Sequence, residues 1–395
     1  MKFEQELIGN HIITLKGFAF KSSWYTGTGV AIVKVSDFTQ DSVSADKVSY
    51  IAIESIGDFE KYKLVKGDIL IQTVGSWEHN PNSVVGKVVR IPEIMNESLL
   101  NQNIVKIIPK ETLDKSFLFY LLRSDVFKGY IIKTAQGSAN QASITLDSIR
   151  AFKFKYKDKL IQQKISSILL AYDDLIENNL KRIKLLEEKA FLRYKEILKS
   201  EKLEKFKLNE VTQILKRGIS PKYVEEDGIV VFNQKCIRNH IVSFGDARLT
   251  GIEKKIPKER LLQKYDTLIN STGAGTLGRI AMNIQDEISA TVDSHITIVR
   301  ANEKVTPVFL SQSLLAQENI IENMGEGSTN QTELSPRKLG EEIKISIPEK
   351  SVMMEFEKQS VPNFNLIWNL QKQNTKLREA RDILLPRLMS GEIVV

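Results

Sequence analysis

The chain has 395 residues, which is too long for one ordinary hydrophobic core and predicts at least two domains. Its net charge of +7 at pH 7 favours a polyanionic partner. Its single cysteine, Cys236, excludes a disulfide framework and a multi-cysteine zinc site, and its four histidines lack metal-ligand spacing. It has no apolar run of about 18 residues and no signal-peptide profile at its start, which predicts a soluble cytoplasmic protein without a membrane span.

The first half of the chain contains three clear local patterns. Residues 67–71 form an apolar run typical of a buried strand, and Asp114 precedes apolar residues at helical spacing, as an N-cap does. Residues 152–156 alternate apolar and basic side chains, which predicts a half-buried strand. These patterns indicate a domain that mixes helices with strands.

A long helix is predicted next, from about residue 160 to residue 200, because this stretch contains no proline or glycine. Its apolar residues recur at spacings of three and four, with one slip in phase. This pattern is typical of a coiled-coil seam with a stutter. The proposed seam residues are Ile165, Tyr172, Leu175, Ile183 and Leu186.

The second half of the chain repeats the first in register. Residues 137–141 read Gly-Ser-Ala-Asn-Gln, and residues 327–331 read Gly-Ser-Thr-Asn-Gln. The strand patterns recur at 265–269 and 343–347, and a helix opened by Thr306 and Pro307 matches the one after Asp114. Leu7, Ile13 and Gly17 correspond to Leu208, Ile214 and Gly218. The repeat therefore predicts one fold unit written twice.

A second long helix is predicted near the C-terminus, with seam residues Ile367, Leu370, Asn374, Leu377 and Leu384. The polar Asn374, and Arg381 in the same stripe, are of the kind that sets register rather than stability. Pro362 predicts a kink or a late start of this helix. Because so narrow an apolar stripe needs a helical partner, we expect the two long helices to pair antiparallel. A dimerisation coiled coil in an unrelated protein is the alternative.

Candidate DNA-binding residues cluster at matching places in the two halves. They combine cations for phosphates with hydroxyls, amides and aromatics for bases, although a solvated turn would have a similar composition. In the first half they are Lys16, Lys21, Ser22, Trp24, Tyr25, Lys34 and Ser36. In the second half they are Arg217, Ser220, Lys222, Tyr223, Gln234, Lys235, Arg238, Ser271 and Thr272. Two copies with one framework and different polar side chains would read two different sequences.

Catalytic signatures are weak. Residues 273–278 satisfy G-x-G-x-x-G, but a strand rather than a helix is predicted after them, which favours a glycine-rich hairpin. Asp246 with Glu253, Lys254 and Lys255 resembles a nuclease pattern without a match in the other half. Residues 80–83 lack the aromatic residue of an amino-methyltransferase tetrapeptide, and no phosphate-binding lysine loop occurs. No catalytic residue and no metal site are predicted.

Taken together, Gly-Phe-Ala-Phe-Lys-Ser-Ser near the start, Gly-Asp-Ile-Leu in the middle and the repeated Gly-Ser-x-Asn-Gln resemble the specificity subunit of a type I restriction-modification system. The resemblance implies an α+β fold in which two pseudo-repeated α/β target-recognition domains (1–157 and 204–347) are separated by two long antiparallel coiled-coil helices (158–203 and 348–395).

It also implies a non-catalytic reader of a bipartite double-stranded DNA target with a fixed gap. Its expected partners are methyltransferase subunits, two in number, and restriction or translocase subunits. S-adenosylmethionine is expected on the methyltransferase, and no cofactor on this chain. The alternatives are a stand-alone methyltransferase or nuclease, and an architectural coiled-coil protein that binds DNA without sequence preference.

Overall fold

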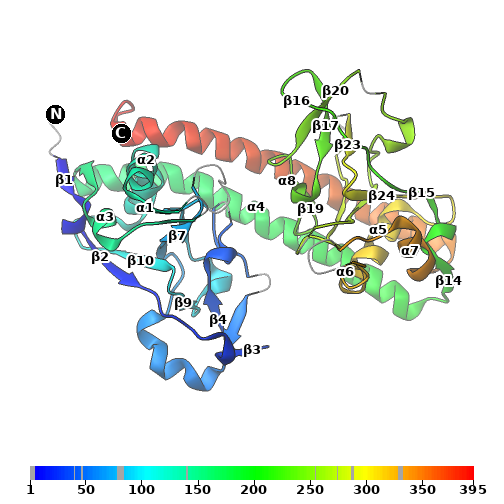
Figure 1. Cartoon of the computed structure of the whole chain (residues 1–395), viewed down its shortest axis with the longest axis horizontal. Helices are drawn as coiled ribbons and strands as arrows, with labels where there is room; N and C mark the ends of the chain where they lie inside the picture. The colour runs from blue at the N-terminus through cyan, green and yellow to red at the C-terminus, as the bar shows by residue number, and fades with distance from the viewer. Residues whose placement is uncertain are drawn as a thin grey trace. The chain divides into compact units, whose positions relative to one another are not determined.

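The computed structural model describes residues 5–39, 41–45, 48–77, 84–138, 141–253, 255–273, 275–285, 289–327 and 332–395, apart from the side chains of residues 55 and 56. The chain folds into two compact units. The first comprises Met1–Ile176 with Lys376–Val395, and the second comprises Glu177–Thr375. Each unit contains part of both long helices (Figure 1).

The first unit contains two four-stranded sheets and a small two-stranded one. The first sheet is antiparallel in the order β2-β10-β6-β8, formed by Ile12–Lys16, Ile104–Pro109, Ile69–Gln72 and Val88–Arg90. The second has the order β3-β5-β4-β9, formed by Tyr25–Thr26, Ser49–Ile51, Val30–Val33 and Leu99–Leu100, with β4 parallel to β9. The third pairs β1 (Gln5–Leu7) with β13 (Lys153–Lys155).

A short three-stranded sheet and three short helices complete the first unit. The sheet has the order β11-β12-β7, formed by Gln136–Ser138, Gln141–Ser143 and Val74–Gly75. The helices are α1 (Lys115–Arg123), α2 (Asp125–Thr134) and α3 (Leu146–Arg150). As predicted, Asp114 caps α1, since its carboxylate accepts a hydrogen bond of 2.8 Å from the Phe117 backbone N–H. The buried Phe117 and Leu118 then face the core of the unit.

The second unit repeats the two four-stranded sheets and the small two-stranded sheet of the first unit. Its first sheet has the order β15-β24-β21-β22, formed by Thr212–Arg217, Ile296–Ala301, Thr267–Asn270 and Ile280–Met282. Its second has the order β16-β20-β17-β23, formed by Tyr223–Val224, Arg248–Gly251, Gly228–Phe232 and Ala290–Val292, again with one parallel pair. It also contains β14 (Glu204–Lys207) paired with β25 (Lys344–Ile347), β18 (Ile237–Arg238) paired with β19 (Ile241–Val242), and helices α5 (Pro307–Leu315), α6 (Glu318–Glu322) and α7 (Pro336–Glu342). The predicted duplication is thus confirmed in the fold.

The matching glycines Gly17 and Gly218 stand where the chain leaves the first sheet for the second. The Gly17 N–H donates to the Ile104 carbonyl at 3.0 Å, and the Gly218 N–H donates to the Ile296 carbonyl at 2.9 Å. A Cβ at either position would collide with a backbone carbonyl, of Asn101 or of Val292. Glycine is therefore needed in both copies for the close approach of two backbone segments.

The two long helices are α4 (Lys159–Ser200) and α8 (Lys350–Ser390). In the first unit Ile165 of α4 shares a core with Leu388 of α8, and in the second unit Ile183 of α4 shares a core with Ile367 of α8. The start of one helix therefore packs with the end of the other, which is the antiparallel order that was predicted (Figure 1). Among the described residues, no helix is both long enough and apolar enough to cross a bilayer.

Most proposed seam residues lie in or beside the packed stripe. Those buried are Ile165, Ile183, Ile367, Leu370 and Asn374, and those half-buried are Tyr172, Leu186, Leu377 and Leu384. Leu175 lies outside the packed stripe, because its side chain is 49% exposed, whereas Ile176 of the same apolar pattern is buried. The helical step from Tyr172 to the next seam position is therefore four residues rather than three.

The predicted late start at Pro362 is also wrong, since α8 begins at Lys350 and continues through the proline. Pro362 has no backbone N–H, so the carbonyl of Lys358, four residues earlier, lacks its helical hydrogen-bond donor. Both residues are exposed. Water can therefore satisfy that carbonyl. The predicted domain boundaries at 157, 203 and 347 lie beside the ends of β13, α4 and β25 and stay a prediction.

Asn374 is hydrogen-bonded across the helix pair within the second unit. The Asn179 amide of α4 donates to the Asn374 amide oxygen at 2.9 Å, and the two side chains are 4% and 2% exposed. A buried amide pair of this kind is satisfied in one helix register only. The register role predicted for Asn374 therefore has a partner, Asn179, that sequence analysis missed.

We expect Asn374→Leu to destabilise the chain by about 1 kcal/mol, because it removes one of the two acceptors of the buried Asn179 amide, the other being the Gln373 side-chain oxygen at 3.0 Å. The double variant Asn179→Leu with Asn374→Leu removes both polar groups and should recover most of that loss. Urea denaturation of the wild type, both single variants and the double variant measures this coupling. Additive single effects would show that the pair does not act as a unit.

Candidate nucleic-acid interface

A tyrosine opens the first strand of the second sheet in both units. Tyr25 pairs with Ile51, and Tyr223 pairs with Thr250 in the equivalent strands. A cation lies over each ring: the Lys34 Nζ is 5.5 Å from the Tyr25 centroid, and the Arg248 guanidinium carbon is 3.5 Å from that of Tyr223. The two cations come from different places, since Lys34 follows β4 and Arg248 begins β20. The framework is shared while its polar side chains differ.

The first unit adds an aromatic cluster beside this tyrosine. Phe18 contacts Phe20 at 5.1 Å, Phe59 at 4.9 Å and Trp24 at 6.2 Å between ring centroids, the last pair being stacked. Trp24 is 39% exposed, and the Lys21 Nζ lies 5.5 Å from its ring centroid. Exposed rings flanked by cations offer stacking and charge to a nucleic acid together. The predicted Lys16, Ser22 and Ser36 are likewise exposed.

A short turn after the next strand is built alike in both units. The Lys34 N–H donates to the Asp37 carboxylate at 2.7 Å, and the Asn233 N–H donates to the Cys236 Sγ at 3.4 Å. Burial raises the pKa of Cys236 to about 11, so this thiol stays protonated and has a structural role. Ser36 and Lys235 then occupy the same exposed position of the turn. The predicted correspondence between these two segments is therefore confirmed.

The glycine-rich segment of the second unit joins the antiparallel strands β21 and β22, as predicted for a hairpin. Beside it, the Thr272 hydroxyl lies 2.7 Å from the His295 Nδ1 and donates to the Gln234 amide oxygen at 3.2 Å. The three side chains form a polar cluster with donor and acceptor groups. His295 is exposed, and the other two are half-buried.

Ser271 does not belong to this surface, and its assignment as a DNA contact is wrong. Its side chain is fully buried, and its hydroxyl lies 2.6 Å from the Thr297 hydroxyl on the neighbouring strand. The hydroxyl suggested base contact, but its position at the end of a central strand turns it into the sheet.

Arg217 is half-buried and paired within the second unit. Its guanidinium forms an ion pair with Glu333 and donates to the Leu334 carbonyl at 3.0 Å. Lys222, Ser220 and Arg238 are exposed by contrast. We therefore regard Lys222 as the better candidate for a phosphate contact.

Electrostatics connects the tyrosine of the second unit with the polar cluster. Burial raises the pKa of Tyr223, the nearby Asp293 carboxylate adds to this rise, and Arg248 opposes it. The Asp293 carboxylate also accepts a hydrogen bond of 2.9 Å from the His295 backbone N–H. Tyr223, Asp293 and His295 thus belong to one polar environment.

Sequence analysis missed three cationic or titratable side chains at this surface, Arg248, Arg279 and His295. Burial and then the charge of Arg238 lower the pKa of Arg279, which places the two guanidiniums near one another. Arg279 follows the glycine-rich segment directly, so a cation after such a hairpin was an available signal. Arg248 lies far from Tyr223 in the sequence, so no local pattern indicated that the two side chains meet.

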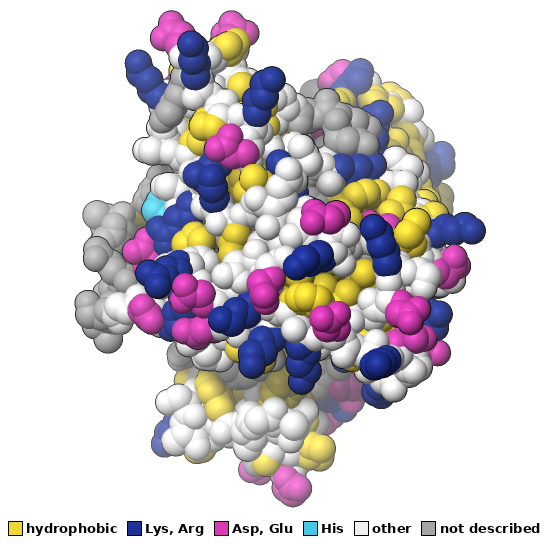
Figure 2. Space-filling model, turned by 90° about the vertical axis from the view of Figure 1, so that its right-hand side faces the viewer, with side chains coloured by type: hydrophobic (Ala, Val, Ile, Leu, Met, Phe, Trp, Pro, Cys, Tyr) yellow, Lys and Arg dark blue, Asp and Glu magenta, His cyan; other side chains and the backbone are white. Residues whose placement is uncertain are grey.

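The nuclease-like pattern around Asp246 is only partly covered by the described residues and stays a hypothesis. Among the residues that the structure describes, no group of three His, Cys, Asp or Glu side chains is placed to hold a metal ion. Lys254, His79 and residues 80–83 lie outside the described residues, as do residues 139–140 of the first Gly-Ser-x-Asn-Gln motif and residues 328–331 of the second. Lys and Arg side chains stand beside Asp and Glu on the face in Figure 2. The proposal of DNA binding therefore rests on local groups of side chains rather than on one uniformly basic face.

These features define a protein made of two copies of one module, each exposing its own aromatic and cationic side chains on a common frame. Comparison with known proteins agrees, since residues 12–188 match the type I restriction modification DNA specificity domain. The chain is 24% identical to the type I restriction enzyme MjaIX specificity subunit of Methanocaldococcus jannaschii, over 76% of this chain and 74% of that protein. Residues 12–188 therefore resemble a type I restriction modification DNA specificity domain, and the chain is similar to type I restriction enzyme specificity subunits.

Two further comparisons give a partial sequence match and a shared fold. The putative type I restriction enzyme MjaX specificity subunit of the same organism is 30% identical over 40% of this chain and 37% of its own length. The crystal structure of the type I restriction-modification S subunit from M. genitalium has the same fold. It covers 98% of this chain and 96% of that chain, with a TM-score of 0.54 at 17% identity.

Proposed function

We propose that this chain is the non-catalytic DNA-recognition subunit of a restriction-modification complex, in which each unit reads one half of a bipartite target. The observation that carries the proposal is the tyrosine and cation pair on equivalent strands of both units, with Lys34 in one and Arg248 in the other. One framework with different polar side chains is what two half-sites of different sequence require.

The long helices supply the rest of the proposed function. A register fixed by Asn179 and Asn374 is a means of keeping a constant gap between the two half-sites. Their outer faces are proposed to bind two methyltransferase subunits, with restriction or translocase subunits joining the complex. S-adenosylmethionine would be held by the methyltransferase, and this chain would bring that enzyme to its target.

The test is to co-express the chain with its methyltransferase and to map modified bases across a host genome by single-molecule sequencing. A split motif with a constant gap is the expected result. A stable complex without any motif would favour the architectural alternative, which predicts no preference among sequences. Methylation or cleavage of DNA by the purified chain alone would favour the stand-alone enzyme.

We expect substitutions in one unit to weaken recognition of one half-site only. Lys222→Glu with Arg248→Ala in the second unit, or Lys21→Glu with Lys34→Ala in the first, should cost about 1–3 kcal/mol, or roughly 5- to 150-fold in affinity. Competition binding by the assembled complex, with duplexes altered in one half at a time, measures this. Lys344→Glu, at an exposed position of β25, is the matched control. Equal losses over both halves would contradict the division of labour.

A further inference from the structure

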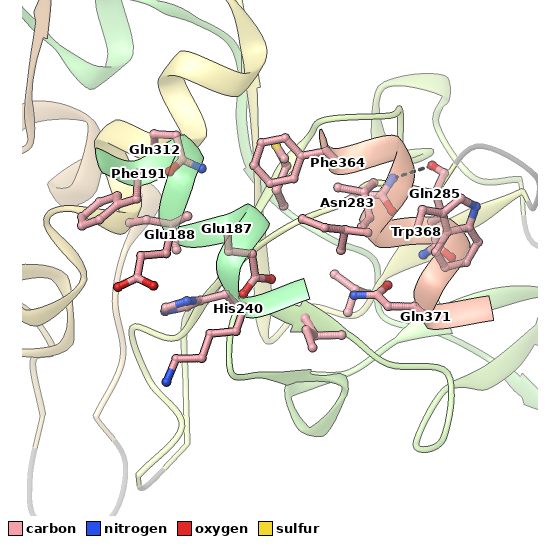
Figure 3. Close-up of a pocket in the computed structure, with 17 residues that line it drawn as sticks. Glu187, Glu188, Phe191, His240, Asn283, Gln285, Gln312, Phe364, Trp368 and Gln371 are labelled. Atoms are coloured by element: carbon pink, nitrogen blue, oxygen red, sulfur yellow. Dashed lines mark hydrogen bonds between the residues drawn. The ribbon is translucent and has the colours of Figure 1, made fainter. Parts of the chain in front are cut away.

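The second unit contains a pocket of about 280 Å³, and none of its lining residues is among the proposed DNA-binding residues. It lies between α4, α8, the hairpin of β18 (Ile237–Arg238) and β19 (Ile241–Val242), and the segment that follows β22 (Figure 3). Aromatic rings from both long helices line it, namely Phe191, Phe364 and Trp368. The pocket therefore offers flat apolar walls, which favour a planar ligand.

Three polar groups of this pocket have buried atoms without a hydrogen-bond partner among the described residues. They are the Asn283 side-chain oxygen, both amide atoms of Gln285 and the indole N–H of Trp368. Asn283 and Gln285 are only 2% and 5% exposed. The Asn283 amide N–H groups are used by the Gln263 carbonyl at 2.9 Å and the Gln285 carbonyl at 3.3 Å, which leaves its oxygen as a free acceptor. Buried amides are rarely left unpaired, so these atoms point to a ligand with matching donors and acceptors.

The charges around the pocket favour a neutral ligand. Burial raises the pKa of Glu187 to about 7, against the smaller opposing effect of His240, so its carboxyl resists ionisation here. The exposed Glu188 is a second acid in the lining, and Lys184 is the single lysine or arginine among the lining residues. A phosphate would therefore meet the exposed carboxylate of Glu188, and Lys184 would be the one lysine or arginine of the lining available to it.

We propose that this pocket binds a free purine base or its nucleoside, with the Asn283 and Gln285 amides on the edge of the base and aromatic rings against its faces. The Gln285 amide can pair with the amino group and a ring nitrogen of adenine together, and the Asn283 oxygen can accept a hydrogen bond from an amino group. A base that belongs to DNA presents the same edge, but it would bring phosphates beside Glu187 and Glu188. The proposed ligand site does not include the residues that are proposed to contact DNA.

The test uses the purified full-length chain and ligand-detected NMR with adenine, adenosine, adenosine monophosphate and a short unpaired oligodeoxyadenylate. Adenine and adenosine are expected to bind, with the monophosphate weaker by about tenfold or more because of the acidic lining. Absence of binding by adenine and adenosine at millimolar concentration would overturn the proposal. So would equal binding of the monophosphate, or displacement of adenosine by the oligonucleotide.

A variant separates a ligand site from a structural role of the amide. Gln285→Leu should weaken adenosine binding by about tenfold or more, because it removes the hydrogen bonds to the base. It should also raise the Tm of the ligand-free chain by about 2–4 °C, since it removes a buried amide whose atoms have no hydrogen-bond partner among the described residues. Gln213→Leu, at an exposed position of β15, is the control for a glutamine outside the pocket. A lower Tm for Gln285→Leu would show that the amide is structural and would overturn the assignment.

Discussion

Replacement of Arg381 by methionine is expected to destabilise the first unit by about 3–5 kcal/mol, because it removes the buried cation that Asp41 and Asp173, both half-buried, share. The Arg381 side chain is 1% exposed, and one of its guanidinium nitrogens lies 2.7 Å from Asp173 and 3.1 Å from Asp41. Asp173 lies on α4, Arg381 on α8 and Asp41 on a loop of the domain. One side chain thus connects three separate segments of this unit.

The neighbouring cations moderate this loss without replacing Arg381. Arg378 donates to Asp41 at 2.7 Å, and Arg123 donates to Asp41 at 3.1 Å. Both of these arginines keep contact with solvent. We therefore expect the free energy of unfolding to fall by an amount near the lower end of that range, about 3 kcal/mol. Urea denaturation of Arg381→Met, with Arg387→Met as a control for an exposed ion pair with Glu392, measures the difference.

The pH dependence of unfolding gives an independent check on the same network. Burial opposes ionisation of Asp41, but Arg123, Arg381 and Arg378 outweigh it and lower its pKa to about 2. Because this pKa is lower than in the unfolded chain, the stabilisation is present above about pH 4 and is lost as the pH falls toward 2. Arg381→Met should show a weaker loss over that range. An unchanged pH profile would mean that Arg381 does not hold this carboxylate.

Replacement of Gly218 by alanine is expected to destabilise the second unit by about 4 kcal/mol or more, as for a forced backbone clash in a core. The new Cβ would overlap the backbone carbonyl of Val292, and this carbonyl accepts the Ile219 N–H at 2.9 Å. Relief of the clash therefore breaks the connection between the two sheets. Since Lys222 and Tyr223 follow directly, DNA binding by this half should fall together with stability.

Gly245→Ala is the matched control in the same unit, because its new Cβ would approach only the Ser243 hydroxyl, at 3.6 Å. Its stability should change by about 1 kcal/mol or less. Thermal unfolding and half-site binding of both variants are the measurements. A Gly218→Ala variant as stable as Gly245→Ala would remove the argument that the matching glycines exist for close backbone approach.

Local sequence pattern was sufficient for much of this fold. Apolar alternation placed the strands at 153–155 and 344–347, capping chemistry placed the helix after Asp114, and the lack of breakers placed the helix up to Ser200. These signals depend on neighbours within one turn or one strand, so a sequence displays them directly. The duplication was visible for the same reason, because the same local rules recur in order.

Long-range packing decided the features that sequence analysis missed or misplaced. Ser271 has the chemistry of a DNA contact, but the hydroxyl of Thr297 holds it inside the sheet. Leu175 and Ile176 are equally apolar, and only the partner helix selects the second for burial. Arg248 lies over Tyr223 because two strands pair across more than twenty residues. Which side chain faces a partner depends on where distant segments meet, and the sequence near each residue carries no record of that.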